Sequence, residues 1–372
     1  ESVRENNFMK VLHIITRMNT GGPAVFLDHL TTSINELGCQ SVIAYGFCES
    51  NESDYTNNHK LKTELIKIKS LHRSLSPIDD IRAFFQIRKV IKQVQPDLVN
   101  THTSKGGVLG RVAAKSVSRK LPVVHTFHGH LIYGYFAKYK IFVFTLIEKF
   151  LALFTDAAAS ITQETQDSLR GLKIGKKMKW QVIRLGIPVN QTTFLAPKSN
   201  NKTNLLWVGR FTDIKDPFYA VSVMQELEKL SPGKFDLTMV GGGELLEELK
   251  LGSKSLPISF TGWLDKPFES VGYFDLLLLT SKNEGMGLVM LEAANYNKAT
   301  VARNVGGVGE FVTDNKNGFL VTGDADQMAF KINSLTNEII DQAGKNCKLV
   351  LENEFTDKVM ANNYLKLYKS LI

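Results

Sequence analysis

Short apolar runs rich in β-branched residues alternate with segments of helical periodicity along most of this 372-residue chain. The first run covers residues 10–16 and precedes a helical pattern, and a second run at 98–102 does the same. Strands that alternate with helices form βαβ units, whose strands lie parallel. A polar stretch at 186–203, broken by prolines, interrupts the alternation before it restarts at 204. We therefore predict an α/β protein with two Rossmann-like domains.

The chain is longer than one hydrophobic core usually serves, which supports two domains. We expect the first to span residues 9–194 and the second 200–352, followed by a helical ending at 355–372 with apolar residues on one face. Met9 is expected to be the natural first residue. Open parallel sheets bind ligands at the carboxyl ends of their strands, so the default site is the cleft between the domains.

Composition limits the class of protein and its partners. The hydrophobic share of 43% and the charged share of 22% fit a soluble globular protein. Three widely spaced cysteines, Cys39, Cys48 and Cys347, indicate a reducing compartment without a disulfide framework. Residues 1–190 hold 26 Lys and Arg against 15 Asp and Glu. The first half therefore suits an anionic partner: a phosphorylated ligand, an anionic lipid or a nucleic acid. No recognisable nucleic-acid-binding module is present, which disfavours the last.

A glycine loop at 18–26 follows the first predicted strand. Gly21 and Gly22 allow positive φ and a close approach of a ligand, and Pro23 suits the first turn of a helix. The free amides of that helix could bind a phosphate. An ordinary glycine turn is the alternative interpretation.

Two cations, Arg210 and Lys215, follow the first strand of the second half within the segment 208–217. At the carboxyl edge of a sheet they would neutralise a diphosphate, which needs positive charge and several hydrogen-bond donors. A solvated surface pair is the alternative.

Two carboxylates with seven residues between them stand in the loop and helix that follow the apolar run 274–281. Glu284 lies among glycines on a predicted strand-to-helix loop, and Glu292 lies inside the helix. Gly285 and Gly287 leave the amides of residues 286–289 uncovered at a helix N-terminus. A carboxylate accepts two hydrogen bonds from a vicinal diol, so a hexose and a ribose of one long ligand are the expected partners. For Glu292, a charge on the helix surface is the alternative.

These residues carry a resemblance. The segments "EGMGLVMLEA" and "VGGVGEFV" resemble the E-x7-E signature of glycosyltransferase family 4, whose members are retaining enzymes of GT-B fold. The resemblance extends along nearly the whole chain, through "GGP", "THTSKGGVLGRVAAK", "VVHTFHGHLIYGYF", "VIRLGIPVNQTTF", "VGRFTDIKDP", "VGGGEL", "FTGW" and "FTDKVMANNYLKLY". The last segment resembles the helix that crosses back to the first domain. Arg184 and the pair Asn297–Lys298 depart from the family's usual residues beside the site.

The resemblance implies a role for each matching position. Glu284 would bind the donor hexose, Glu292 the ribose, and Arg210 and Lys215 the diphosphate, while His128 would touch the sugar. The other implied donor-binding residues are Gly22, Gly209, Gly242, Thr261, Gly285, Met286, Gly287, Leu288 and Val289. The implied acceptor-binding residues are His102, Lys105 and Tyr133.

No metal or cofactor is expected. Four histidines, His102, His125, His128 and His130, crowd the ends of two strands, but no Cys or carboxylate stands at a companion ligand spacing. The "GDAD" segment at 323–326 matches the Asp-x-Asp of metal-dependent transferases, yet it opens a predicted helix, which favours helix capping.

We therefore predict a retaining, metal-independent glycosyltransferase. It would move a hexose or N-acetylhexosamine from a nucleotide diphosphate sugar, expected to be UDP-linked, to a lipid-linked saccharide in bacterial polysaccharide synthesis. The enzyme would lie in the cytoplasm against the inner face of the membrane. Most apolar residues of the aromatic and basic run 131–154 are expected to be core, and its end with Tyr133, Tyr135, Lys138, Tyr139 and Lys140 is the candidate anchor. Two alternatives remain: a GT-B nucleotide-sugar epimerase, and a non-catalytic subunit that recruits a partner transferase.

Overall fold

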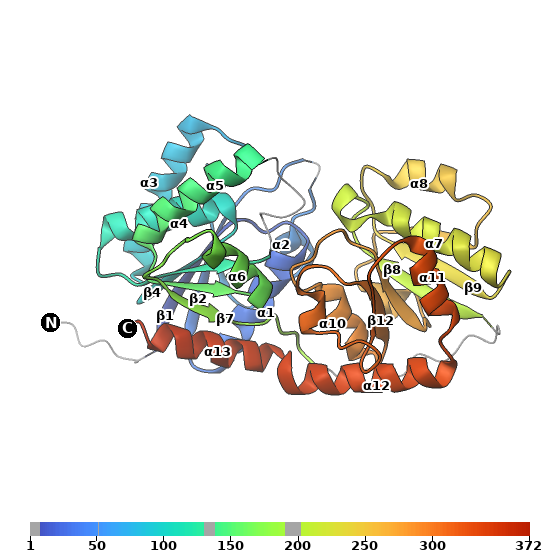
Figure 1. The fold of residues 1–372 in the computed structure, drawn as a ribbon. Helices are drawn as coiled ribbons and strands as arrows, with labels where there is room; N and C mark the ends of the chain where they lie inside the picture. Colours follow the sequence, from blue (N-terminus) through green and yellow to red (C-terminus); the bar gives the residue numbers. More distant parts are fainter. Residues whose placement is uncertain (1–7, 51, 130–137, 190–201) are drawn as a thin grey trace. The chain divides into compact units, whose positions relative to one another are not determined.

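A computed structural model of the protein describes residues 8–50, 52–129, 138–189 and 202–372. The chain divides into two compact units. Unit 1 comprises Glu1–Pro188 and Thr356–Ile372, and unit 2 comprises Val189–Phe355. Each unit has an all-parallel sheet with helices on both faces (Figure 1). The predicted α/β class with two Rossmann-like domains is confirmed.

Unit 1 is built on a seven-stranded sheet with the order β3-β2-β1-β4-β5-β6-β7. Its strands are β1 Lys10–Arg17, β2 Gln40–Gly46, β3 Glu64–Lys67, β4 Leu98–His102, β5 Val123–Phe127, β6 Ala157–Ser160 and β7 Lys179–Val182. Its helices are α1 Gly22–Glu36, α2 Tyr55–Asn58, α3 Pro77–Val94, α4 Ser104–Val117, α5 Lys138–Leu151, η1 Ala152–Phe154, α6 Gln163–Gly171 and α13 Asp357–Lys369. The edge strand β3 was not predicted, because polar residues surround its four positions.

Helix α4 packs closely on the sheet of unit 1 because glycines face it. A Cβ atom on Gly106 would lie 2.7 Å from the backbone nitrogen of Thr16, and one on Gly110 would lie 2.7 Å from Thr101 Cγ2. Arg111 on the same helix makes a buried two-bond ion pair with Glu148 of α5, at 2.8 Å for each bond. These contacts fix α4 and α5 on one face of the sheet.

The C-terminal helix α13 belongs to unit 1, as the resemblance predicted. Thr356 caps the helix by accepting a hydrogen bond from the Val359 amide, and the Asp357 amide donates to the Ile187 carbonyl oxygen at 3.0 Å. The Tyr368 hydroxyl accepts a 2.7 Å hydrogen bond from the side-chain amide of buried Asn100. A separate helix, α12, lies in unit 2 and ends at Glu354, just before α13. The predicted helical ending at 355–372 corresponds to α13.

Unit 2 has a six-stranded sheet with the order β10-β9-β8-β11-β12-β13. Its strands are β8 Thr203–Val208, β9 Phe235–Val240, β10 Ile258–Gly262, β11 Leu276–Leu279, β12 Ala299–Arg303 and β13 Phe319–Val321. Its helices are η2 Asp213–Lys215, α7 Pro217–Leu230, α8 Leu246–Gly252, α9 Pro267–Ser270, α10 Leu288–Asn295, η3 Gly306–Glu310, α11 Ala325–Asn333 and α12 Asn337–Glu354.

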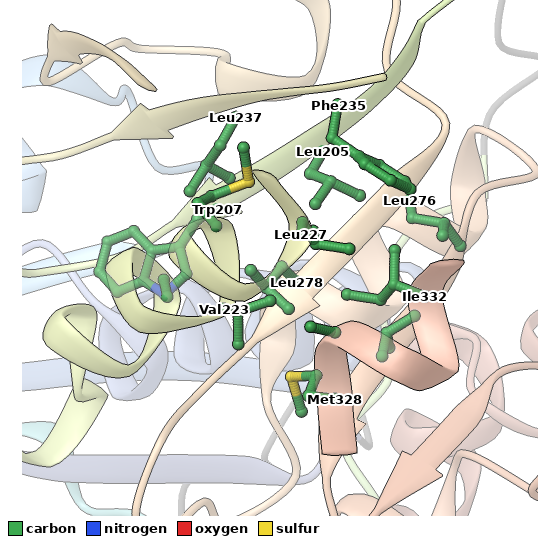
Figure 2. Close-up of a cluster of buried hydrophobic side chains, with 14 of the residues drawn as sticks. Leu205, Trp207, Val223, Leu227, Phe235, Leu237, Leu276, Leu278, Met328 and Ile332 are labelled. Carbon is green, nitrogen blue, oxygen red and sulfur yellow. The ribbon is translucent and has the colours of Figure 1, made fainter. Parts of the chain in front are cut away.

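One face of the unit 2 sheet forms a continuous hydrophobic core with α7 and α11. Figure 2 shows Leu205 and Trp207 of β8 among side chains from β9, β11 and these two helices. Trp207 is almost fully buried, and its indole N–H donates to the Thr280 hydroxyl at 2.9 Å. This core holds β8, β9 and β11 side by side, so the loops at their carboxyl ends are neighbours.

Candidate functional site

Two glycines, Gly241 and Gly243, let the loops after β8 and β9 touch at the carboxyl edge of the unit 2 sheet. A Cβ atom on Gly241 would lie 1.8 Å from the Gly209 carbonyl oxygen, and one on Gly243 would lie 2.5 Å from that of Phe211. The Phe211 amide donates to the Gly242 carbonyl oxygen at 2.9 Å. Side chains at positions 241 and 243 would separate these loops, so the glycines are needed for contact between backbones.

Glu284 lies in the loop after β11, and its carboxylate has very little exposed surface, at 8% for the residue. The Lys215 ammonium contacts Glu284 Oε1 at 2.5 Å, and the Ser281 hydroxyl donates to the same oxygen at 2.6 Å. Lys215 and Glu284 are 69 residues apart in the sequence. Two residues that were predicted separately as diphosphate and sugar ligands therefore form one ion pair.

Thr280 connects this ion pair to the core. Its hydroxyl accepts the indole N–H of Trp207 and donates to the Lys215 carbonyl oxygen at 2.9 Å. The Lys282 amide donates to the Ile214 carbonyl oxygen at 2.9 Å. The backbone of the η2 segment is thus hydrogen-bonded to the end of β11, which places the Lys215 side chain beside Glu284.

The glycine-rich segment after β12 supports the same loop from the other side. Gly306 has a positive φ of 55°, and a Cβ atom there would lie 2.0 Å from the Glu284 carbonyl oxygen. The Gly307 amide donates to that oxygen at 3.1 Å. Any larger residue at 306 would push away the loop that carries Glu284. The "VGGVGEFV" segment therefore holds the loop that carries Glu284 in position.

Free amides follow Glu284. Gly287 caps α10 with a φ of 68°, and Leu288 is the first residue of the helix. The amides of residues 285–289 donate to no acceptor within the described part of the chain. They carry the positive end of the helix dipole, so the segment suits a phosphate or sugar oxygen. Because a helix cannot satisfy its own first amides, this arrangement was predictable from the two glycines.

Glu292 lies one turn further along α10 and is half-buried. No cation or hydrogen-bond donor of the described residues pairs with its carboxylate. Loss of hydration raises the pKa of Glu292 to about 7. The unpaired Glu292 carboxylate on α10 can therefore accept hydrogen bonds from a ligand.

Two protein-family models match segments of the chain. "Glycosyltransferase Family 4" matches residues 20–191, and "Glycosyl transferases group 1" matches residues 202–338. The first covers most of unit 1, and the second covers the β8 to α11 region with the Lys215–Glu284 pair. The chain belongs to glycosyltransferase family 4.

Several relatives of this family 4 glycosyltransferase are named as bacterial enzymes of O-antigen or capsular polysaccharide synthesis. It is 26% identical over 324 residues to the Escherichia coli UDP-Gal:alpha-D-GlcNAc-diphosphoundecaprenol alpha-1,3-galactosyltransferase, covering 82% of this chain and 83% of the relative. It is 25% identical to the Escherichia coli O-antigen biosynthesis glycosyltransferase WbnH, covering 96% and 98%. The crystal structure of Anabaena HepE in complex with UDP-glucose matches with a TM-score of 0.77 at 20% identity, covering 97% and 100%. That likeness shows the GT-B fold.

The remaining donor-side positions of the family 4 enzyme lie at the same sheet edge. Arg210 is exposed, and its guanidinium pairs with no carboxylate among the residues that the structure describes. The Gly209 amide donates to the Val240 carbonyl oxygen at 3.0 Å. Thr261 is exposed at the end of β10, where its hydroxyl donates to the Gly262 carbonyl oxygen. Gly242 faces the Trp263 indole, because a Cβ atom on it would lie 2.7 Å from Nε1.

Two residues of this edge were not predicted. Trp263 is 59% exposed, which is unusual for an indole and leaves a flat aromatic surface beside Gly242. Arg303, at the end of β12, pairs with Asp216 at 2.9 Å and lies over the Tyr219 ring at 4.6 Å. The sequence signal for both was their position at or just after the carboxyl end of a strand, but nothing in the spacing indicated which partners they meet.

In unit 1 the glycine loop has the predicted form. Helix α1 begins at Gly22 with Pro23 in its first turn. A Cβ atom on Gly22 would meet nothing within 4 Å. The fold of unit 1 therefore does not require glycine there, and a ligand that approaches the backbone would explain it.

The structure describes two of the three predicted acceptor-binding residues, and their environments differ. Lys105 is paired with Asp80 at 2.5 Å and also contacts the Ser74 carbonyl oxygen. His102 has no exposed surface, so it cannot touch an acceptor directly. It contacts His128 instead, through Nδ1 and Nε2 at 3.0 Å. Tyr133 and His130 lie outside the described residues.

No group of three or more His, Cys, Asp or Glu side chains in the described ranges is arranged to hold a metal ion. The buried His125 contacts the Thr101 hydroxyl at 2.8 Å. Asp324 of the "GDAD" segment stands at the N-cap of α11, but its side chain makes no capping hydrogen bond. The predicted capping is wrong in that respect.

The pKa of Glu292 predicts how stability depends on pH. Between its ordinary value of 4.5 and about 7 the folded state holds a proton that the unfolded state releases. The free energy of unfolding should therefore fall as pH rises through this window, by up to about 3 kcal/mol. Glu292→Gln removes the titrating group, so we expect it to stabilise the protein at pH 8 and to change little at pH 4.5.

Urea unfolding of the ligand-free protein at both pH values measures this difference. Glu247→Gln, at an exposed position on α8, is the matched control and should show no pH-dependent gain. An equal effect of Glu292→Gln at pH 4.5 and pH 8 would contradict the assigned burial of Glu292.

Proposed function

We propose that this family 4 glycosyltransferase transfers a hexosyl or N-acetylhexosaminyl group from a nucleotide diphosphate sugar to a lipid-linked saccharide, with retention of anomeric configuration. The proposed donor is a UDP-sugar. The unit 2 edge would bind the donor, and unit 1 would bind the acceptor. Retention is what the family resemblance implies.

The observation that carries the proposal is the Lys215–Glu284 ion pair beside the free amides of residues 285–289. The Lys215 ammonium neutralises Glu284. A bound diphosphate would offer Lys215 a second anionic partner, and the Glu284 carboxylate would then be available to hydroxyls of the transferred sugar. Arg210 and the amides would share the negative charge that develops on the departing diphosphate.

The nucleoside end of the donor has two proposed partners. Glu292 has no partner of its own and would accept hydrogen bonds from the ribose diol. The exposed face of Trp263 would stack on the base, an interaction worth about 1–3 kcal/mol in other base-binding proteins. The relative from Escherichia coli that uses UDP-Gal supports uridine as the base.

That same relative supports the class of acceptor. Its name gives a GlcNAc carried on diphosphoundecaprenol, a saccharide linked to a lipid through a diphosphate. For the present chain such an acceptor fits the excess of Lys and Arg in residues 1–190. No metal takes part in the proposed reaction, because the cations of unit 2 would supply the charge that the diphosphate needs.

Substitution of Lys215 tests the proposed reaction. Lys215→Ala removes the cation beside the diphosphate, and we expect kcat to fall by about 10²–10³, as for loss of one donor in a charge-stabilising site. Lys282→Ala is the matched control, because Lys282 forms an exposed pair with Asp213 at 2.5 Å and does not contact Glu284. The control should keep kcat within about twofold.

The measurement is nucleoside diphosphate release from a panel of nucleotide sugars, with and without a lipid-linked saccharide acceptor. Acceptor-dependent release is expected from the proposed transferase. Conversion of the sugar without any acceptor would favour the epimerase instead. Equal rates for wild type and Lys215→Ala in the assembled pathway would favour the non-catalytic subunit.

We also propose that unit 1 attaches to an anionic membrane surface through α5. Phe142, Leu146 and Phe150 lie along one face of this helix and are each more than half exposed, and Leu153 beyond its end is 78% exposed. The expectation that most apolar residues of the run 131–154 are core is therefore wrong for α5. A typical surface helix exposes its charged residues and buries its apolar ones. On α5 the charged Glu148 side chain instead points inward to Arg111, while the apolar side chains named above are exposed. In Figure 1, α5 lies on the surface of unit 1 beside α4.

Lysines near this apolar face supply the electrostatic part of the attachment. Lys149 of α5 lines a hollow together with Lys173, Lys176 and Lys177. Each Lys close to an anionic leaflet adds about 1 kcal/mol of attraction. In the described ranges no helix is long and apolar enough to cross a membrane. The apolar face and the lysines together suit reversible attachment to lipid.

The double substitution Phe142→Glu with Leu146→Glu places two charges on the proposed membrane face. We expect it to abolish co-sedimentation with phosphatidylglycerol vesicles, since the apolar burial is lost and two added negative charges oppose the attraction of the lysines. Leu251→Glu, at a residue of α8 in unit 2 that is 66% exposed, is the control and should sediment like the wild type. Sedimentation of the double variant at the wild-type level would show that α5 is not the attachment site.

A further inference from the structure

Three histidine rings of unit 1 form one hydrogen-bonded row across adjacent strands. His13 Nδ1 of β1 lies 3.2 Å from His102 Nε2 at the end of β4. His102 Nδ1 lies 3.0 Å from Nε2 of His128, which follows β5. The row runs from the buried middle of the sheet to its carboxyl edge. His13 and His102 have no exposed surface, and His128 is half-buried.

The surroundings of the row are aromatic. The Phe26 ring meets His128 edge-on, with centroids 4.7 Å apart, and lies 6.0 Å from the ring of His102. No carboxylate or cation of the described residues pairs with any of the three imidazoles. Burial lowers the pKa of His13 to about 3 and that of His128 to about 4, and it places the pKa of His102 well below its ordinary value. All three rings are therefore neutral at physiological pH.

The protons of such a row can be counted. Three neutral imidazoles carry three N–H protons on six nitrogens, and each ring has one donor and one acceptor. Each of the two contacts between rings needs a donor facing an acceptor. All three protons must therefore point the same way along the row. Either every Nδ1 is protonated, or every Nε2 is.

His13 Nε2, at the closed end of the row, decides between these two patterns. This nitrogen is buried and has no hydrogen-bond partner among the described residues. If every Nε2 were protonated, a buried N–H would be left without an acceptor, which is rarer in proteins than an acceptor left without a donor. If every Nδ1 is protonated, His13 Nε2 is only an acceptor without a donor, which is the less costly of the two arrangements.

We propose that His13 and His102 are positioning residues that hold His128 as its Nδ1–H tautomer, so that His128 presents a hydrogen-bond donor at the sheet edge. Its partner would be an acceptor oxygen of the sugar or the phosphates, a part of the proposal that rests on the proposed function. The row ends at the unpartnered His13 Nε2, so no second proton source stands behind His128. His128 would therefore donate a hydrogen bond to the ligand and would not remove a proton from it.

Nitrogen-15 NMR of the full chain with labelled histidine tests the tautomer without any substrate. We expect His128 to show a protonated Nδ1 and a bare Nε2 from pH 5.5 to pH 8, with its signals assigned by their loss in His128→Gln. A protonated Nε2, or a doubly protonated ring, would overturn the proposal. Because the measurement needs no donor or acceptor, its outcome is independent of the proposed reaction.

Variants of His102 separate positioning from simple packing. His102→Phe removes the donor to His128 Nε2, so we expect His128 to lose its single tautomer and to exchange between two forms. His102→Gln restores an N–H donor and should recover the Nδ1–H form. His125→Phe is the matched control, because His125 is also buried in this sheet but contacts Thr101 and not the row. It should leave the His128 tautomer unchanged.

Catalysis gives a second readout once a substrate is known. Since His128 is not a base, kcat/KM should show no ionisation of His128 between pH 5.5 and pH 8 in the wild type. Should the NMR result hold while no transfer activity is found, the tautomer assignment stands and the proposed function fails. A change of the His128 tautomer equal in His102→Phe and His125→Phe would mean that His102 only packs.

Discussion

A carboxylate that has lost most of its water must be neutralised and hydrogen-bonded if the fold is to tolerate it. At Glu284 the Lys215 ammonium and the Ser281 hydroxyl do this, both on the same carboxylate oxygen. The rest of the unit 2 edge depends on this arrangement. Thr280 fixes the backbone of Lys215, and Gly306 allows the chain to pass against the Glu284 carbonyl oxygen. The result is a prearranged cation and carboxylate that need little reorganisation when a charged ligand arrives.

Unit 1 places its polar groups differently. One face of its sheet has the hydrogen-bonded histidines, and on the same face Asn100 and Thr126 are bonded to Tyr368 and Tyr364 of α13. His128 extends this buried network to the sheet edge. The two units thus share a parallel-sheet plan but differ in chemistry: charged and exposed amide groups in unit 2, and neutral donors in unit 1. The charged groups of unit 2 are those that the proposed binding of a donor diphosphate requires.

The sequence predicted the features that are formed by residues close together along the chain. Parallel sheets, the glycine loop before α1 and the free amides before α10 follow from apolar runs and glycines that are local in sequence. What it could not predict were contacts between distant segments. The Lys215–Glu284 pair joins loops from two strands, and His13 looked like any other residue within an apolar strand. The edge strand β3 was missed because its stability comes from pairing with β2 and not from its own sequence.

The central claim is that unit 2 binds a nucleotide diphosphate sugar with Glu292 on the ribose, and calorimetric titration with nucleoside diphosphates tests it most directly. The proposal predicts that UDP binds more tightly than GDP, ADP or CDP. It also predicts that Glu292→Ala weakens UDP binding by about 10- to 100-fold, the effect of losing hydrogen bonds to a charged group. Binding of none of the four nucleotides, or undiminished UDP binding by Glu292→Ala, would contradict the proposed donor site.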